Sequence, residues 1–558
     1  MRKSSILTLA IPVCCLVLVL SSCSGDDGEP GARPDGAPSE AGEGRETPEP
    51  LPGATASPTE PVFEDESNVL DVAIREPSTL DPMRLQDPGS VLIARQLYEG
   101  LTRWDPGTQQ VQPAVAESWK TSKDARTFTF KLRPDARFSD GTEVTSEDFR
   151  FAFDRIALKK NGSDLAYLLE LVRGFDAVNA FGDAKRLTGV KTPDPRTLVI
   201  QLSEPYVNFP TVLTHPSLVP LKEDSLENID RFLAKPLGNG PFQMAQPFEI
   251  GQPVLLEANE ASADPPDLEG IRFLTFADPA ASWIPFTNGE IDIAEVPTGR
   301  IDEAAEEFGE DGYRPLLVGS YYGFNLRSPQ LRNKSVRRAV NYAIDRDAII
   351  EDIYQGTLTA PRGVLPLGMP GFEDDACGDL CERDLAQAKR IVGKLPKRRR
   401  ELDLQYTREQ PQGRVARAVK RDLEEAGFEV STKSHAFPRY LRILRDNEQD
   451  VFRLGWISEY PDPDAFLSAL FDSSSPDNHT ELSSAKVDEL LARARRERSD
   501  AKRLRLYQRA ERIVIDSVPL APLGSFVSHW AAQPSVEGLE FDVLGGFDAG
   551  GILLESEE

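Results

Sequence analysis

Histidine and cysteine are scarce in this sequence, and their scarcity limits its chemistry. Its 558 residues include four histidines and five cysteines. The histidines, His215, His435, His479 and His529, are too scattered to show the ligand spacing of a metal site. The sequence also lacks Gly-x-Ser-x-Gly, His-Glu-x-x-His and Gly-x-x-x-x-Gly-Lys, the motifs of serine hydrolases, zinc proteases and phosphate-binding loops. We therefore expect neither catalysis nor a bound cofactor or metal.

Positive charge is also in short supply. Lys and Arg number 64 against 91 Asp and Glu, which gives a formal net charge of −27. This charge repels phosphate backbones and anionic lipid headgroups, so nucleic acid and peripheral membrane binding are disfavoured. The basic run from Lys397 to Arg400 is more typical of a solvated surface than of a binding patch. A composition of 40% hydrophobic and 28% charged residues indicates a soluble globular protein, and the length predicts several domains.

The N-terminus has the order of an export signal. Arg2 and Lys3 precede an apolar stretch from Ile6 to Leu20, and small residues lead to Cys23. This arrangement resembles the lipobox of bacterial lipoproteins, which implies cleavage after residues 1–22 and a lipid anchor on Cys23. Residues 23–66 are acidic, rich in Gly and Pro and poor in large apolar side chains, so we expect a disordered tether.

The remaining cysteines form one close pair. Cys14 and Cys15 lie inside the predicted signal, which leaves Cys377 and Cys381 in the exported body. Because disulfides persist outside the cytoplasm, this pair is expected to close a small loop, with free thiols as the alternative.

The body shows strand and helix patterns in irregular alternation, which predicts mixed α/β domains. Alternating apolar residues predict two strands, at 128–132 and 198–202. Apolar spacing of three and four predicts one helix from Ser335 to Tyr354 with Gly356 at its end, and another around 415–423 that stops at Gly427 before a strand. Two further amphipathic helices are expected around 487–494 and 507–514.

A series of short motifs then carries a resemblance to a known family. In chain order they are Glu76 to Pro82, Leu97 to Leu101, Pro113 to Trp119, Phe128 to Pro134, Phe138 to Gly141, Gly238 to Phe242, Asn288 to Asp292, Tyr322 to Leu326, Val336 to Arg346, and Gly455-Trp456 with Tyr460 to Pro463. Each motif is weak alone, but in this order the chain from about Leu70 onward resembles the bacterial extracellular solute-binding proteins of family 5, the peptide and nickel-binding family. These are typified by oligopeptide- and dipeptide-binding lipoproteins of ABC importers.

The resemblance implies a fold and a domain plan. Its members have an α/β, two-lobed periplasmic-binding-protein-like (type II) fold with an extra inserted α/β domain. Carried over, lobe I comprises residues 69–105, 237–318 and 517–558, the inserted domain 106–236, and lobe II 319–516. A cleft between two lobes suits ligand capture, because closure surrounds the ligand and supplies polar partners from both sides.

The resemblance also implies ligand-binding residues. Glu459 lies where peptide-binding relatives hold an aspartate that pairs with the α-ammonium group of the ligand, and it is one methylene longer. Arg453 lies where some relatives hold an arginine for a ligand carboxylate, which its planar fork suits. Gly455 permits close backbone approach and Trp456 offers a flat apolar wall. The further candidates are Gln86 and Asp87, in a segment expected to pair with the backbone of the ligand, and Tyr322.

We therefore expect a lipid-anchored, extracytoplasmic, monomeric solute-binding protein that captures di- or oligopeptides and delivers them to ABC permease and ATPase subunits. Several alternatives remain open. Glu459 could be a solvent-facing turn residue, Arg453 could form a salt bridge within its lobe, and Trp456 and Tyr322 could be core residues. The cargo could instead be a nickel complex, an oligosaccharide or an opine, or the protein could be a surface peptide receptor.

Overall fold

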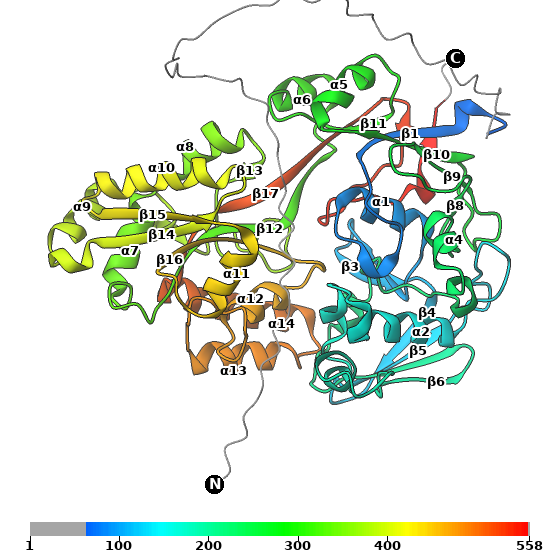
Figure 1. Cartoon of the computed structure of the whole chain (residues 1–558), viewed down its shortest axis with the longest axis horizontal. Helices are drawn as coiled ribbons and strands as arrows, with labels where there is room; N and C mark the ends of the chain where they lie inside the picture. The colour runs from blue at the N-terminus through cyan, green and yellow to red at the C-terminus, as the bar shows by residue number, and fades with distance from the viewer. Residues whose placement is uncertain (1–62, 556–558) are drawn as a thin grey trace, which may run out of the picture.

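The structure, a computed structural model, describes residues 63–555 (Figure 1). The predicted signal, most of the tether and Cys23 lie outside the described residues. The described chain forms two lobes that share one sheet of 11 strands. Its order is β15 (Glu429–His435), β14 (Glu401–Thr407), β16 (Val451–Ile457), β12 (Tyr313–Phe324), β17 (Leu520–Ala532), β11 (Ile293–Glu295), β1 (Val69–Arg75), β10 (Gly270–Phe276), β9 (Val254–Ala258) and β8 (Phe242–Met244), with β13 (Leu358–Thr359) paired to β17.

Two long strands connect the lobes. We call the part around β1 and β8 to β11 lobe I, and the part around β14 to β16 lobe II. β12 pairs with β17 along most of its length, and its last seven residues also pair with β16 of lobe II. The last residues of β17 pair with β11 of lobe I. The β12–β17 register shifts between Pro315 and Gly319 and again between Ser320 and Tyr321, so the ladder is irregular where the lobes meet.

A second, four-stranded sheet covers part of lobe I. Its order is β4 (Ala116–Thr121), β5 (Thr127–Leu132), β7 (Thr197–Gln201) and β6 (Val190–Asp194), and helix α2 (Ser146–Ala157) contacts β6 and β7. The two predicted strands are confirmed as β5 and β7. Phe128, Phe130, Leu198 and Ile200 are fully buried in the core that this sheet shares with β1 and β10. Alternation therefore placed the apolar face correctly.

Lobe II carries most of the helices. The predicted helix–Gly–strand unit is confirmed as α10 (Gln412–Glu425), Gly427 with φ +98°, and β15, which runs parallel to β14. The two amphipathic helices near the C-terminus are confirmed as α13 (Ala485–Ala494) and α14 (Asp500–Ser517). Their apolar residues fill a core with those of α12 (Asp464–Phe471).

The prediction of one helix from Ser335 to Tyr354 is wrong. Helix α7 (Lys334–Ala343) ends where Ile344 adopts an extended backbone, and α8 (Arg346–Ile349) then begins and continues into a π-helical turn (Ile350–Tyr354). The side chain of Asp345 accepts a hydrogen bond from the Ala348 N–H and so caps the second helix. The apolar spacing continues across the break, which is why it does not reveal the cap.

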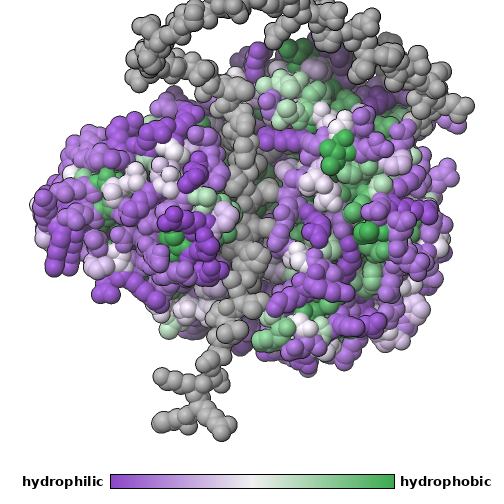
Figure 2. All heavy atoms as spheres, in the orientation of Figure 1, coloured by the Kyte–Doolittle hydropathy of each residue, from purple (hydrophilic) through white to green (hydrophobic). Residues whose placement is uncertain are grey.

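The surface is largely hydrophilic. On the face shown in Figure 2, hydrophilic residues predominate on both lobes and hydrophobic ones are scattered. The exposed large apolar side chains of the described chain are Phe181, Ile229, Leu233, Ile250, Ile284, Leu367 and Leu553. Within residues 63–555, no helix is both long and apolar enough to cross a membrane.

The close cysteine pair lies in lobe II, where Cys377 is buried and Cys381 is partly exposed. In the structure Cys377 and Cys381 are joined by a disulfide across a short 3₁₀ turn (Gly378–Leu380), with their Cα atoms 5.8 Å apart. The Cys377 N–H also donates to the Arg362 carbonyl, which fastens the turn to the loop before it.

Candidate functional site

Glu459 lies at a junction of the two lobes. It follows β16 of lobe II, and its Oε2 is 3.5 Å from Nε2 of His215, which follows α3 (Phe209–Val212) in the part of lobe I predicted as the inserted domain. His215 is 4% exposed, whereas the Glu459 side chain retains 29% of its surface. The Ser217 N–H donates to His215 Nδ1 at 3.1 Å, so in the neutral ring the proton is on Nε2, facing the carboxylate. His215 therefore lies against Oε2 of the carboxylate, and part of the Glu459 side chain remains exposed to solvent.

Arg453 is a buried cation. It is 5% exposed, and its Nη2 donates to Ser320 Oγ at 2.8 Å and to the Tyr354 hydroxyl at 3.3 Å. Its Nε has no hydrogen-bond partner in the described chain, and no carboxylate of residues 63–555 forms an ion pair with it. Tyr322, opposite Arg453 in the β12–β16 ladder, is fully buried with an unpartnered hydroxyl. Burial raises the pKa of Tyr322, and the positive charge of Arg453 opposes that rise.

Gly455 and Trp456 are held in the same strand. A Cβ on Gly455 would lie 3.1 Å from the Gly319 carbonyl oxygen, so the neighbouring strand comes close at this position. The Trp456 Nε1 donates to the Ala465 carbonyl at 2.7 Å in α12, and the half-buried ring packs against the lobe II core. The indole N–H is thus satisfied within lobe II, and part of the ring stays exposed.

Gln86 and Asp87 lie in lobe I. Asp87 caps helix α1 (Pro88–Leu97): its Oδ1 accepts from the Ser90 N–H at 2.8 Å. Gln86 Nε2 donates to Asp164 Oδ2 at 2.5 Å. Both side chains thus have partners within lobe I, and the other five predicted ligand residues lie in lobe II.

The segment after Glu459 fastens lobe II to the inserted part of lobe I. The Asn208 amide donates to Asp462 Oδ2, the Val207 N–H donates to the Arg495 carbonyl at 2.8 Å, and the half-buried Tyr460 packs against the lobe I core. This contact is separate from the crossing strands β12 and β17. Motif spacing gave no indication of it, since Asn208 and His215 lie far from residue 459 in the sequence.

A buried ion pair supports that segment from lobe II. Asp464, which is 6% exposed, accepts from Arg495 Nε at 2.9 and 3.0 Å, from the Tyr507 hydroxyl at 3.1 Å and from Ser468 Oγ at 2.5 Å. The negative charge of Asp464 raises the pKa of Arg495. Three elements, α12, α13 and α14, are therefore tied to one carboxylate.

The free energy of unfolding is expected to fall as pH rises, because of the buried Asp462. Burial raises the pKa of Asp462 from 3.8 to about 6. Between these values the folded protein binds more protons than the unfolded chain, so the free energy of unfolding falls as pH rises, and the loss is complete above the folded pKa. Through this group the wild type should lose about 1 kcal/mol between pH 5 and pH 7.5, and Asp462→Asn should lose correspondingly less. Unfolding of both proteins at both pH values measures the difference; an equal pH dependence would contradict it.

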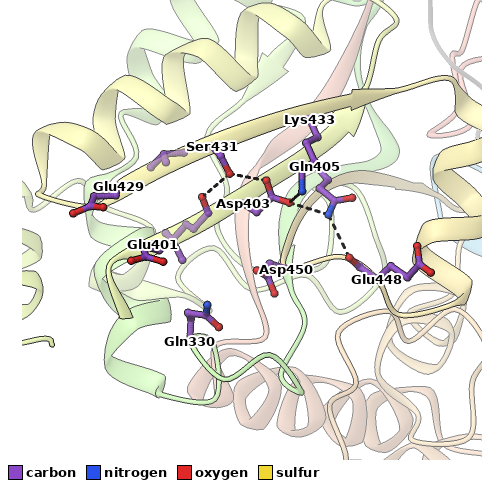
Figure 3. A pocket seen from close by; sticks show the side chains of 11 residues that line it. Gln330, Glu401, Asp403, Gln405, Glu429, Ser431, Lys433, Glu448 and Asp450 are labelled. Carbon is purple, nitrogen blue, oxygen red and sulfur yellow. Dashed lines mark hydrogen bonds and ion pairs between the residues drawn. The ribbon is translucent and has the colours of Figure 1, made fainter. Parts of the chain in front are cut away.

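A cavity of about 670 Å³ lies elsewhere on lobe II, over β14 and β15 (Figure 3). Its lining comprises Gln330, Glu401, Leu402, Asp403, Gln405, Glu429, Val430, Ser431, Lys433, Glu448 and Asp450. Asp403 accepts from Lys433 Nζ at 2.9 Å and from Ser431 Oγ at 2.7 Å, so the one lysine of the lining is paired within it. None of the predicted ligand residues belongs to this cavity. Among residues 63–555, no group of three or more His, Cys, Asp or Glu side chains is placed to hold a metal ion.

The sequence model of the bacterial extracellular solute-binding proteins, family 5 (middle region), matches residues 110–478. The chain belongs to this family. The match includes the four-stranded sheet, the crossing strand β12 and the strand that carries Arg453 to Trp456, but not the second crossing strand, β17. The resemblance inferred from the short motifs is thereby confirmed.

Curated relatives of family 5 extend along most of the chain. The oligopeptide-binding protein OppA of Bacillus subtilis is 27% identical over 487 residues, which cover 83% of this chain and 88% of that protein. The probable deoxycholate-binding periplasmic protein YgiS of Escherichia coli is 29% identical over 464 residues, covering 80% and 86%. The relatives thus have different cargoes in their names.

Solved family 5 structures confirm the α/β two-lobed fold. The unliganded open form of the murein tripeptide binding protein MppA has a TM-score of 0.75 at 24% identity and covers 89% of this chain and 99% of its own. Haemophilus influenzae OppA in complex with the peptide RPPGFSPFR has a TM-score of 0.67 at 22% identity, covering 88% and 100%. The family consists of solute-binding proteins, so this chain is a solute-binding protein and not an enzyme.

Proposed function

We propose that this protein captures peptides between its lobes and delivers them to the permease and ATPase subunits of an ABC importer. Support comes from relatives named for oligopeptides and dipeptides that match along most of the chain, and from a solved neighbour titled as the substrate-binding domain of an oligopeptide ABC transporter of Bacillus anthracis. The observation that carries the proposal is the Glu459 carboxylate, partly exposed at the lobe junction just after β16, the strand that also carries Arg453, a buried arginine without an acidic partner among residues 63–555.

In this proposal the two charges bind the two ends of a short peptide. Glu459 receives the α-ammonium group, since a carboxylate and an ammonium form a short charge-assisted hydrogen bond. Arg453 receives the carboxylate, and the exposed edge of Trp456 lines the space between them. The backbone beside Gln86 and Asp87 pairs with the peptide main chain from lobe I, which would accept many sequences. Tyr322 lies opposite Arg453 on the neighbouring strand β12 and completes the surroundings of the guanidinium.

The test is direct binding of peptide mixtures to the purified protein. We expect random peptides of two to six residues to be retained in native mass spectra, to raise the thermal unfolding midpoint and to remain uncleaved on prolonged incubation. Retention of a non-peptide solute and indifference to peptides would overturn the proposal.

A second cargo class has a specific observation in its favour. The relative named for deoxycholate is 29% identical to this chain, as high as the peptide-named relatives reported above. A bile-acid anion would use Arg453 without needing Glu459, because it has a carboxylate and no ammonium. Deoxycholate in the same thermal-shift assay separates the two cargoes.

We also propose that a lipid on Cys23 holds the protein at the outer face of the cell membrane, with residues 23–66 as the tether and the domain plan as predicted from the sequence. Cys23→Ser is expected to release most of the protein into the medium, because in this proposal the acyl chains on Cys23 are what attach the protein to the membrane. Fractionation of cells producing each form measures this, and retention of the variant with the membrane fraction would contradict the anchor.

A further inference from the structure

The pairing of Glu459 with His215 points to a residue that no motif singled out. We propose that His215 is a positioning residue of the ligand-amine site: it orients the Glu459 carboxylate from the opposite lobe and so sets the preference for ligands with a free amino terminus. This inference rests on the proposed role of Glu459 and adds the partner that makes that role effective.

The first support is the way His215 itself is held. Its ring is 4% exposed, and Nδ1 is fixed by the Ser217 N–H at 3.1 Å and by Ser217 Oγ at 2.7 Å. The Leu218 N–H donates to the His215 carbonyl at 2.9 Å, which closes the turn around the ring. A ring held on one edge in this way presents Nε2 in one direction, and that direction is toward Glu459 Oε2.

The second support is the state of the carboxylate. Among residues 63–555, His215 is the one residue that forms an ion pair with Glu459. The Ser458 N–H donates to the Leu317 carbonyl at 2.9 Å, which fixes the backbone just before Glu459. With the backbone fixed and Oε2 at the histidine, the carboxylate has one preferred orientation and loses less rotamer entropy when a ligand binds.

The third support is the length of the side chain. An aspartate at position 459 would place the carboxylate about 1.5 Å closer to the backbone, given an ordinary C–C bond length. The observed separation is 3.5 Å, so that retreat would break the close approach of the oxygen to His215 Nε2. The longer side chain of a glutamate at this position therefore matches a histidine supplied by the other lobe.

The crossing has a consequence for selectivity. Because His215 belongs to the inserted part of lobe I and Glu459 to lobe II, the carboxylate is oriented only while these two parts are in contact. Free-amine recognition is thereby tied to the arrangement of the lobes.

The test compares two isosteric replacements. Glutamine at position 215 keeps an N–H near the place of Nε2, whereas asparagine keeps only a polar atom near the place of Nδ1. The probe is a mixture of random di- to hexapeptides and the same mixture N-acetylated, and the readout is the ratio of the two apparent affinities by native mass spectrometry.

We expect the wild type to prefer free-amine peptides, His215→Asn to lose about tenfold of that preference, and His215→Gln to keep it within about twofold. An unchanged preference in His215→Asn, or an equal loss in both variants, overturns the inference. If His215→Asn does not fold, Glu459→Asp tests the contact from the exposed side, and full retention of the preference there also overturns it.

The two proposals fail in different ways. No preference for free amines in the wild type removes Glu459 as the amine anchor and the role of His215 with it. A clear preference in the wild type that Glu459→Gln abolishes and His215→Asn does not leaves the anchor in place and removes only His215.

Discussion

Replacing Glu459 with alanine is expected to weaken peptide binding by about 2–5 kcal/mol, as for truncating one member of a desolvated charge pair. The physical reason is that closure of the lobes around a peptide would bury its ammonium group, and without the carboxylate that charge has no counter-charge at this position. The Glu459 side chain is already more than two-thirds buried, and its Oε2 lies 3.5 Å from Nε2 of His215. Isothermal titration calorimetry with a peptide identified from the bound mixture measures the change.

The matched control for this variant is Glu429→Ala. Glu429 lines the cavity over β14 and β15 and pairs with Lys397 at 3.7 Å, far along the sheet from the lobe junction. We expect its removal to leave peptide affinity unchanged. Loss of affinity in Glu429→Ala together with normal affinity in Glu459→Ala would move the ligand to that cavity.

Replacing Asp464 with alanine is expected to lower the free energy of unfolding by about 3–5 kcal/mol, the usual cost of breaking a buried ion pair by removing one partner. The change strands the Arg495 guanidinium, whose side chain is 24% exposed, and leaves the Tyr507 hydroxyl without this acceptor. Urea unfolding followed by tryptophan fluorescence measures the loss.

Glu489→Ala provides the control for Asp464→Ala. Glu489 pairs with Lys486 and Arg493 on the exposed side of α13, so solvent replaces both partners when it is removed. We expect no measurable change in its unfolding. Equal stability of the two variants would show that the Asp464–Arg495 pair contributes nothing net to lobe II.

Much of the fold could be predicted from the sequence because its signals are local. The alternation at Phe128 to Leu132 and the helix stop at Gly427 each depend on a few neighbouring residues, and both are confirmed. The break between α7 and α8 could not be predicted from apolar spacing, because the pattern continues while the Asp345 cap and the Asp345 N–H to Asp422 hydrogen bond interrupt the helix. Competition between a cap and a periodic pattern is decided by tertiary contacts.

Of the contact between Glu459 and His215, only the lobe II part could be predicted from the sequence. The run from Arg453 to Glu459 is contiguous, so its motif could be recognised, and the structure places it on one strand and the turn after it. His215 is one of four histidines scattered along the sequence, and nothing in a linear sequence shows which loop lies opposite a given carboxylate. The roles assigned to Glu459, Arg453 and the loop of Gln86 and Asp87 remain predictions.

The irregular β12–β17 ladder has a mechanical consequence. Gly524 in β17 has φ +155°, and a Cβ there would lie 2.2 Å from the Thr359 carbonyl oxygen. The backbone of β13 therefore packs closely against β17 next to the second register shift. The register is already broken between Pro315 and Tyr321, where the lobes join. Residues 316–318 of β12 have no partner in the β17 register. Rotation of one lobe against the other would therefore bend the connection where fewer β12–β17 pairs need to be broken than in a regular ladder.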